Sequence, residues 1–449
     1  MGQISIVLIA GLVFLFFFEP SWGAEGFNQL LTLIVTVVVI ILPPALVYFL
    51  GSYATRALPI DQEARLRRVY LIKRSVIAFE CLLLIGYICD VYLLNLPLLT
   101  SKTLEWVPLI YTKHLVGIVP LIAGLILIRL ALYEVEQQVT SSNWKRGEYL
   151  SVHLKFLLLP LLPLFVYLSL LDLIAYIPIL ADYSYLPIAL MMSLIFLAYI
   201  HAPLLLGLIW RTTPLTDINL KNRLHRLALQ DNIKYKDIVI WQTESVANAA
   251  VAGIAPWSRQ IFLTKALLQH FSDDEIEAIV AHEFGHVRYK HILTYLMFLI
   301  AYFLSYAIYY IYIGQPLESI PSAYSLLPAI GLVFFISLYF VIIFRALSRR
   351  FEHQADLYAV ALTDKPEALE LALVRLAYLN YTPRSIQRLF ELFQTHPSVD
   401  RRIKFIERFQ GGDPSALRYQ NYLLEVKLLL VLLPALACIL FFSNPSTLG

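Results

Sequence analysis

Long apolar runs dominate the chain and alternate with shorter polar stretches. A helix that crosses a hydrocarbon core of about 30 Å needs roughly 20 apolar residues. Roughly nine runs approach or reach that length between charged or turn-forming residues. We therefore predict membrane spans at 4–18, 28–50, 76–98, 115–133, 156–181, 185–210, 292–313, 325–344 and 428–442, the first and last of them short.

The first run is either a retained span or a cleaved signal peptide. No positively charged residue precedes it. Trp22 stands where a signal peptide would carry a small residue if cleavage followed Ala24. Both features favour a retained span.

Basic residues in the short loops predict the orientation, because such residues concentrate on the cytoplasmic side. The loop 311–324 has no Lys or Arg, and 98–114 has only Lys102 and Lys113. The other loops are basic: Arg56, Arg65, Arg67, Arg68, Lys73 and Arg74; Lys145 and Arg146; Arg345, Arg349 and Arg350. Both long polar segments, 211–291 and 345–427, then face the cytoplasm.

The same pattern predicts the domain organisation. A multi-span membrane region occupies 1–210, two polar halves of one domain occupy 211–291 and 345–427, a transmembrane hairpin at 292–344 separates them, and 428–449 forms a last span. In the first half, apolar positions Ile218, Leu220, Leu224, Leu227 and Leu229 predict a helix with one buried face. The β-rich pieces 237–241 and 259–264 flank 246–254 and predict a small sheet with turns near Gly253 and Pro256.

Composition agrees with a membrane protein and excludes several other classes. Of 449 residues, 59% are hydrophobic and 15% charged, and the mean hydropathy is +0.69. The net charge of +3 is too small to indicate a nucleic-acid partner. Cys81, Cys89 and Cys438 lie in apolar stretches and predict neither a disulfide framework nor a metal site. The bilayer is the partner that the pattern indicates.

One polar motif stands out in the first polar segment. The stretch 278–291 reads AIVAHEFGHVRYKH, and Ser272 with Glu275 predicts a capping box at the start of a helix through 273–290. On that helix His282 and His286 share one face, as two ligands of a tetrahedral zinc require. Glu283 beside them is suited to take a proton from zinc-activated water.

A catalytic zinc needs a third protein ligand. The extension in which a further histidine follows on the same helix fails, because Tyr289 and Ile292 occupy its two positions. The better candidate is in 348–360, SRRFEHQADLYAV, where a helix would place Glu352 and Asp356 on one face. Glu352 would complete the ligand set for one Zn²⁺ per chain, and Asp356 would orient a ligand imidazole.

Other residues support or compete with this set. Ala355 and Gly285 are small enough for the two helices to approach closely, and Arg349 could neutralise the carboxylates. His353 would point about 100 degrees away from Glu352 on a helix, so we exclude it as a ligand. His291 lies off the ligand face and is interpreted as supporting the ligands from behind or lying at a helix interface.

These motifs together resemble the integral-membrane gluzincin metallopeptidases that include the CAAX prenyl endopeptidase and the HtpX-like proteases. The resemblance covers roughly 211–410. It rests on NAAVAG, AHEFGHVRYKH, a membrane hairpin, RRFEHQAD and THPSVDRRI, in that order. The implied fold is an all-α multi-span membrane protein with a cytoplasm-facing α+β zincin domain, split by a transmembrane hairpin.

The resemblance also implies roles for individual residues. Glu352 matches the third zinc ligand, His396 matches a histidine near the metal that could stabilise an oxyanion, and Arg402 matches an arginine that supports the site. Asn248 and Ala249 match an edge strand that pairs with an extended substrate. The extra spans before and after the polar segments depart from the simplest relatives and leave the substrate class open.

The sequence therefore predicts a membrane-embedded zinc metalloendopeptidase acting on protein or peptide substrates, membrane-associated or misfolded, in a bacterial inner membrane. A site-2-type intramembrane protease is disfavoured, because SDDEIE and RYKH flank the motif with charge. The alternative from another class is a non-catalytic scaffold or transporter with a zincin fold. Glu80, Asp90, Arg129, Asp172 and His201 within the spans would favour it if they lined a cavity, whereas pairing inside the bundle would not. No feature specifies an oligomeric state.

Overall fold

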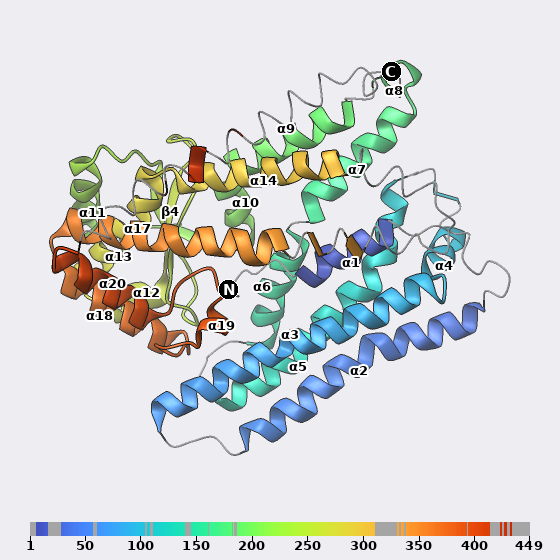
Figure 1. Cartoon of the computed structure of the whole chain (residues 1–449), viewed down its shortest axis with the longest axis horizontal. Helices are drawn as coiled ribbons and strands as arrows, with labels where there is room; N and C mark the ends of the chain where they lie inside the picture. Colours follow the sequence, from blue (N-terminus) through green and yellow to red (C-terminus); the bar gives the residue numbers. More distant parts are fainter. Residues whose placement is uncertain are drawn as a thin grey trace. The chain divides into compact units, whose positions relative to one another are not determined.

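The computed structural model describes most of the chain. The described residues are 6–16, 28–56, 61–103, 106–107, 111–139, 145–159, 161–181, 183, 186–309, 330–331, 334–335, 338–392, 394–413, 423, 426–428 and 432. The chain divides into two compact units, Met1–Ile195 with Tyr309–Ser337 and Phe196–Ile308 with Leu338–Gly449. Each unit is described by itself (Figure 1).

The first unit consists of helices. They are α1 Ile6–Phe16, α2 Gln29–Thr55, α3 Gln62–Tyr92, α4 Leu96–Thr103, the 3₁₀ helix η1 Thr112–Ile118, α5 Val119–Val139, α6 Arg146–Leu158, α7 Leu161–Ala175, α8 Pro178–Ala181 and most of α9 Leu186–Ile200. Among the described residues, three stretches are long and apolar enough to cross a membrane: Gln29–Thr55, Glu63–Tyr92 and Leu115–Gln137. They confirm three of the predicted spans.

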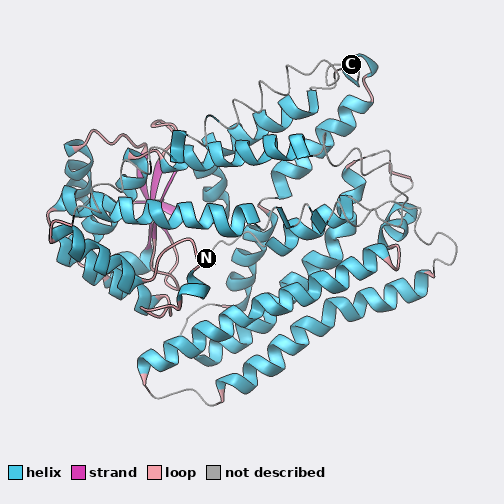
Figure 2. Ribbon diagram, viewed as in Figure 1, coloured by secondary structure: helices cyan, strands magenta, loops and turns pink. Residues whose placement is uncertain are grey.

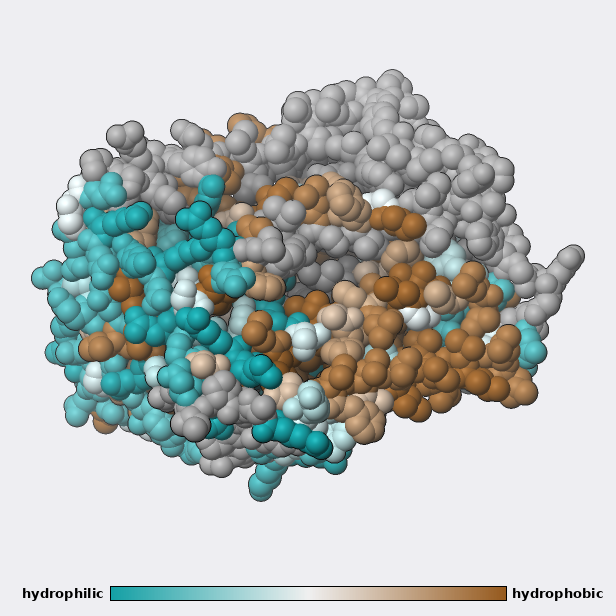
Figure 3. Space-filling model, turned by 60° about the horizontal axis from the view of Figure 1, so that its bottom comes forward, coloured by the Kyte–Doolittle hydropathy of each residue, from teal (hydrophilic) through white to brown (hydrophobic). Residues whose placement is uncertain are grey.

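The outer face of α2 has the character of a lipid-facing surface. Leu33, Val37 and Ile41 are 49%, 52% and 54% exposed. Figure 3 shows a continuous hydrophobic area on one part of the surface and a largely hydrophilic area on another. Exposed apolar patches of this extent are rare on soluble monomers, so this surface supports a membrane setting.

Two of the predicted spans are interrupted. The predicted span 156–181 contains the end of α6 and all of α7, which are bent by 42° relative to each other. The predicted span 185–210 contains α9 and α10 Ala202–Ile209, and His201 separates them. Hydropathy predicts an apolar run, but it does not register the prolines and polar residues that break a helix within it.

Three of the ionisable residues predicted within spans form contacts inside the first unit. Arg129 of α5 forms an ion pair with Glu80 of α3. Asp172 of α7 accepts a hydrogen bond from the backbone N–H of Tyr111 at 2.7 Å. For these residues, pairing inside the bundle is the interpretation that the contacts confirm.

The second unit contains a small sheet (Figure 2). Its strands are β1 Thr212–Pro214, β2 Asp237–Trp241, β3 Ala249–Ala252 and β4 Gln260–Thr264, in the order β1-β2-β4-β3. β2 and β4 are parallel, whereas β1 and β3 are antiparallel to their neighbours. Gly253 follows β3 and has φ +97°. The position requires glycine, because a Cβ there would lie 2.9 Å from the Arg259 Cα. The predicted sheet and its first turn are confirmed.

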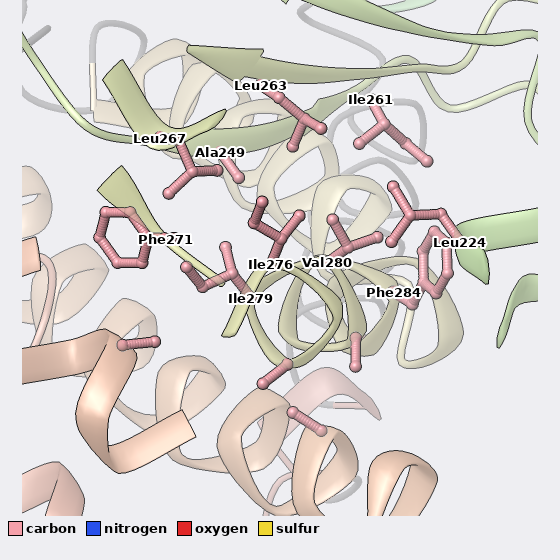
Figure 4. Packing of buried hydrophobic residues seen from close by; sticks show 14 of the residues in the cluster. Leu224, Ala249, Ile261, Leu263, Leu267, Phe271, Ile276, Ile279, Val280 and Phe284 are labelled. Atoms are coloured by element: carbon pink, nitrogen blue, oxygen red, sulfur yellow. The ribbon is translucent and has the colours of Figure 1, made fainter. Parts of the chain in front are cut away.

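Helices cover both faces of this sheet. The helices of the second unit are α10, α11 Ile218–Gln230, α12 Lys265–His270, α13 Asp273–Arg288, α14 His291–Tyr309, the π-helical turn η4 Leu338–Phe344, α17 Arg345–Thr363, α18 Pro366–Leu379, α19 Arg388–Glu391 and α20 Val399–Gln410. Figure 4 shows Ile261 and Leu263 of β4 facing Ile276 and Val280 of α13. On the opposite face, Trp210 stacks on Trp241 with ring centroids 4.4 Å apart.

The amphipathic face of α11 is narrower than predicted. Leu220, Leu224 and Leu227 are buried, but Ile218 and Leu229 are 72% and 64% exposed. Residues two positions from a buried one lie about 200° around a helix, so these two side chains point outward. Including them in the buried face was wrong.

The two arms of the predicted hairpin 292–344 pack together where they are described. The Tyr339 hydroxyl of η4 donates to the Phe298 carbonyl of α14 at 2.9 Å, and the two rings lie 4.1 Å apart. The residues between the arms and most of the predicted last span, 428–442, lie outside the described residues.

Candidate metal centre

Three side chains from two helices converge on one point. His282 and His286 come from α13 and Glu352 from α17, and their closest N and O atoms all lie within 4.8 Å of one another. The Nε2 atoms of the two histidines are 3.2 Å apart. Glu352 oxygens lie 3.4 Å from His282 Nε2 and 3.6 Å from His286 Nε2.

These separations fit a bound metal. Ligand atoms about 2.1 Å from a tetrahedral zinc lie roughly 3.4 Å from one another. The other nitrogen of each ring already has a neighbour, so both Nε2 lone pairs and a buried carboxylate are directed at the same space. Two imidazoles and one carboxylate are the donor set of a catalytic zinc site with an open position.

Local sequence explains why α13 presents this face. Ser272 and Glu275 form the predicted capping box, and the Ser272 backbone N–H donates to Glu275 Oε2 at 2.8 Å. Asp273 and Asp274 in the first turn favour the positive end of the helix dipole. The helix ends at Arg288, two residues earlier than predicted, because Lys290 adopts a left-handed φ of +56°.

The close approach of α13 and α17 depends on two small residues. A Cβ added to Gly285 would lie 2.9 Å from the Ala355 Cα and 3.2 Å from its Cβ. The helices therefore approach almost backbone to backbone beside the metal cluster. This contact brings Glu352 within reach of the two histidines, as the small residues predicted.

Asp356 and Arg402 lie behind His282. Asp356 Oδ1 is 2.9 Å from His282 Nδ1, and Arg402 Nε donates to Asp356 Oδ2 at 2.9 Å. All three side chains are buried. Burial alone would raise the pKa of Asp356, but Arg402 and His282 together outweigh it and hold that pKa below its usual range. Asp356 is thus an ionised acceptor, and Arg402 is a cation in direct contact with the carboxylate cluster.

A second contact lies behind His286. Its Nδ1 is 2.9 Å from His291 Nδ1, and His291 Nε2 is 2.9 Å from Gln354 Oε1. His291 is completely buried, and burial holds its pKa well below the ordinary value. The contact places His291 behind His286, which is one of the two positions that the sequence left open for it.

Glu283 joins the metal cluster to the sheet. Its Oε2 accepts a hydrogen bond from the Val251 backbone N–H of β3 at 3.0 Å. Burial, together with repulsion from Glu352, raises the pKa of Glu283 to about 7. A carboxylate with such a pKa can both take up and release a proton near neutral pH.

β3 is the terminal strand of the described sheet, and its free edge adjoins Glu283. Asn248 exchanges hydrogen bonds with Thr264 on the β4 side, at 2.9 and 3.0 Å. Because backbone groups alternate sides along an antiparallel strand, those of Ala249 and Val251 face the free edge. Asn380 holds Ala247, the residue before Asn248, because its side chain accepts from the Ala247 N–H and donates to the Ala247 carbonyl.

His396 reaches the cluster from a loop. Its Nδ1 lies 2.7 Å from Glu352 Oε2, and its side chain is 62% exposed. Arg349 Nη1 donates to the carbonyls of Glu391, Leu392 and Gln394, which anchors the chain just before this loop. Arg402 is the cation that contacts Asp356, and Arg349 donates to these backbone carbonyls.

A cavity of about 700 Å³ opens beside His286. It runs past Gly253 and Ile254 at the end of β3, and its charged lining residues are Asp231, Lys234, Arg259, Arg288 and Lys290. Arg288 pairs with Asp231 at 2.9 Å. Arg259 donates to the carbonyls of Gly253, Lys234 and Ile254. Lys234, Lys290 and Arg259, whose carbonyl partners carry no net charge, leave the cavity with a positive surplus.

Some of these residues had a sequence signal and others had none. His353 packs against Phe405 with ring centroids 4.2 Å apart, which agrees with its exclusion as a ligand. Gln354 and Asn380 were missed. Gln354 lies within the motif RRFEHQAD, but its partner His291 is 63 positions away. Asn380 pairs with Ala247, which is 133 positions away.

Comparison with known proteins agrees with this geometry. The model of peptidase family M48 matches residues 214–410, which include every residue of the metal cluster. A protease HtpX homolog of Campylobacter concisus is 31% identical over 213 residues, covering 41% of this chain and 72% of that protein. The chain belongs to peptidase family M48. A protease HtpX homolog 2 of Methanosarcina mazei is 27% identical over 209 residues, covering 41% and 70%.

The fold of this M48 peptidase also has a solved counterpart. The crystal structure of S. mikatae Ste24p covers 90% of this chain and 100% of its own, with a TM-score of 0.54 and 18% identity. At this identity the likeness concerns the fold. Family and fold together make the protein a membrane metallopeptidase, and they do not favour a scaffold or transporter.

Proposed function

We propose that the chain is a zinc metalloendopeptidase in which His282, His286 and Glu352 hold one zinc ion. The observation that carries the proposal is the convergence of two Nε2 atoms and one carboxylate at 3.2 to 3.6 Å. A bound zinc supplies a Lewis acid that polarises the scissile carbonyl and acidifies water.

Glu283 is the general base of the proposed reaction. Its carboxylate takes a proton from the attacking water while the water oxygen bonds to the scissile carbonyl carbon. When the C–N bond breaks, the same proton passes to the leaving nitrogen, which departs as an amine and leaves a carboxylic acid that then releases its proton to solvent at neutral pH. The buried position of Glu283 raises its pKa above the ordinary value, which favours uptake of the proton.

The substrate lies extended along β3 in this proposal. The backbone groups of Ala249 and the carbonyl of Val251 pair with it as another strand would, and Asn248, whose backbone faces β4, comes just before that edge. Val251 already donates to Glu283, so a peptide on this edge passes the base directly. Its continuation enters the cavity beside His286.

The remaining residues support these steps. Asp356, kept ionised by Arg402, orients His282. His396 is exposed and adjoins Glu352, so it can donate a hydrogen bond to the oxygen on which negative charge develops. Arg349 holds the segment that carries His396.

The setting is proposed on the distribution of basic residues. Cytoplasmic loops are rich in Lys and Arg, and the loops next to both polar segments have this character. We place the two halves of the zincin domain, 211–291 and 345–427, at the cytoplasmic face of a bacterial inner membrane. Membrane-associated or misfolded proteins are the proposed substrates.

Zinc content tests the ligand set. The purified full-length chain in detergent should hold about one zinc per chain after dialysis. Glu352→Ala should lose it, whereas His353→Ala, on the same helix, should retain it. Metal analysis by mass spectrometry gives the ratio. Retention of zinc by Glu352→Ala at the wild-type ratio contradicts the ligand assignment.

Cysteine labelling tests the orientation. A cysteine at Gln410, exposed on α20, should react with a membrane-impermeant maleimide in inverted vesicles and not in intact cells. A cysteine at Ser319, in the loop without basic residues, should behave in the opposite way. The reverse pattern at both sites would overturn the proposed orientation.

A further inference from the structure

The two histidines of the proposed zinc site are supported differently. His282 Nδ1 faces the ionised Asp356. His286 Nδ1 faces a second histidine, His291, at 2.9 Å. The far nitrogen of His291 faces the side-chain oxygen of Gln354, also at 2.9 Å.

The chemistry of imidazole fixes the direction of these contacts. A neutral imidazole that binds metal through Nε2 carries its proton on Nδ1, so His286 must donate to His291 Nδ1. His291 then accepts with Nδ1, and the one proton of its neutral ring is on Nε2. That proton points at Gln354 Oε1, which is an acceptor. Each nitrogen and oxygen in the contacts from His286 through His291 to Gln354 is therefore either a donor or an acceptor, with no choice left open.

The packing holds His291 in this orientation. Its ring stacks on Phe351 with centroids 4.0 Å apart and an interplanar angle of 6°. His291 and Phe351 are completely buried, and Gln354 is 4% exposed. A doubly protonated His291 would set two N–H groups against each other across the contact with His286.

We infer that His291 and Gln354 are positioning residues for the metal centre, because their hydrogen bonds fix the ring orientation and the tautomer of His286. The inference rests on the proposed zinc site. It assigns to α14 and α17 a neutral support for one ligand, beside the charged support that Asp356 gives the other. Such partners commonly contribute a factor of about 10 to 100 in metal affinity.

The test is zinc affinity, measured by competition with a chromophoric chelator on the purified full-length protein. His291→Phe keeps a ring to stack on Phe351 but removes the acceptor, and it should weaken zinc binding about 10- to 100-fold. His291→Asn places an amide oxygen near the position of Nδ1 and should restore most of the affinity. Gln354→Leu should also weaken binding.

The double variant separates positioning from packing. If Gln354 acts through His291, then His291→Phe with Gln354→Leu should bind zinc no more weakly than His291→Phe alone. Additive losses in affinity, or failure of His291→Asn to rescue, would overturn the inference. Thermal unfolding of the zinc-free variants controls for stability. Wild type without zinc contradicts the zinc site itself, whereas unchanged affinity in His291→Phe contradicts only the positioning role.

Discussion

Gly285 determines how closely α13 and α17 can approach. Replacement by alanine would put a Cβ 2.9 Å from the Ala355 Cα, and backbone cannot yield as a flexible side chain can. Gly285→Ala should destabilise the protein by about 1–3 kcal/mol and lower its zinc affinity. Thermal unfolding and chelator competition measure the two effects.

Gly207 is the matched control for that prediction. It lies within α10, and no heavy atom lies within 4 Å of the Cβ that a substitution would add. Gly207→Ala should leave stability unchanged or raise it by up to about 1 kcal/mol, because alanine favours helix. Equal effects at the two positions would mean that the close approach has no special importance.

At the residue scale, the sequence predicts side chains that act through local spacing. His282 and His286 share one helix face, Glu283 is next to His282 in the chain, and Glu352 and Asp356 share a face of another helix, so local spacing alone groups the residues of each helix. Gln354 and Asn380 act on residues far along the chain. No spacing rule connects them to their partners, His291 of α14 and Ala247 before β3. Only the three-dimensional packing of the second unit brings each pair together.

At the element scale, a charged network joins α11 to the start of α13. Arg223 donates to Glu277 at 2.7 and 2.9 Å and to Asp273 and Asp274. Lys365, before α18, adds a further contact to Asp274 at 2.8 Å. These contacts link α11, the start of α13 and the start of α18.

This network should make stability depend on pH. The hydrogen bond from Arg223 lowers the pKa of Glu277. Its stabilisation is therefore present above the ordinary pKa of about 4.5 and is lost as the pH falls through the lowered value. Arg223→Gln should cost about 1 kcal/mol at pH 7 and progressively less at acidic pH.

Thermal unfolding of Arg223→Gln and of wild type, at pH 7 and at acidic pH, measures how this stability cost changes with pH. Arg226→Gln is the control, since Arg226 is exposed on the same helix. A cost of Arg223→Gln that stays constant with pH would exclude the ion pairs as its source.

Elements were predictable where one physical signal dominated. The capping box placed the start of α13, and short β-rich runs placed β2 and β4. Predictions failed where two signals competed. The span predicted at 185–210 is interrupted at His201, and Leu229 adds apolar character to α11 without being buried.

At the scale of the whole molecule, the cavity beside His286 predicts a preference in substrates. Its positive surplus should favour peptides with acidic residues on the side that enters it. Lys234→Glu should raise KM for an acidic peptide about three- to tenfold and lower it for the matching basic peptide, with kcat nearly unchanged.

Lys236→Glu provides the comparison, because Lys236 is exposed nearby and changes the net charge equally without lining the cavity. Steady-state kinetics with acidic, neutral and basic versions of one peptide give the ratios. Cleavage of all three at equal efficiency by wild type would remove the proposed role of the cavity while leaving the peptidase intact.

The arrangement of the chain also shows where sequence reasoning ends. Hydropathy separates the polar segments from the apolar ones, and the motifs predict that the two polar segments form one site. That α17 meets α13 through Gly285 and Ala355 follows from three-dimensional packing, for which small residues gave only a hint.

The most direct test of the account is cleavage of an unfolded model protein by wild type and Glu283→Gln, both purified in detergent and assayed for zinc. The account predicts equal zinc content, cleavage by wild type that chelation abolishes and zinc restores, and a rate at least 10²- to 10⁴-fold lower for the variant. Cleavage at the wild-type rate by Glu283→Gln, with zinc bound, would contradict it.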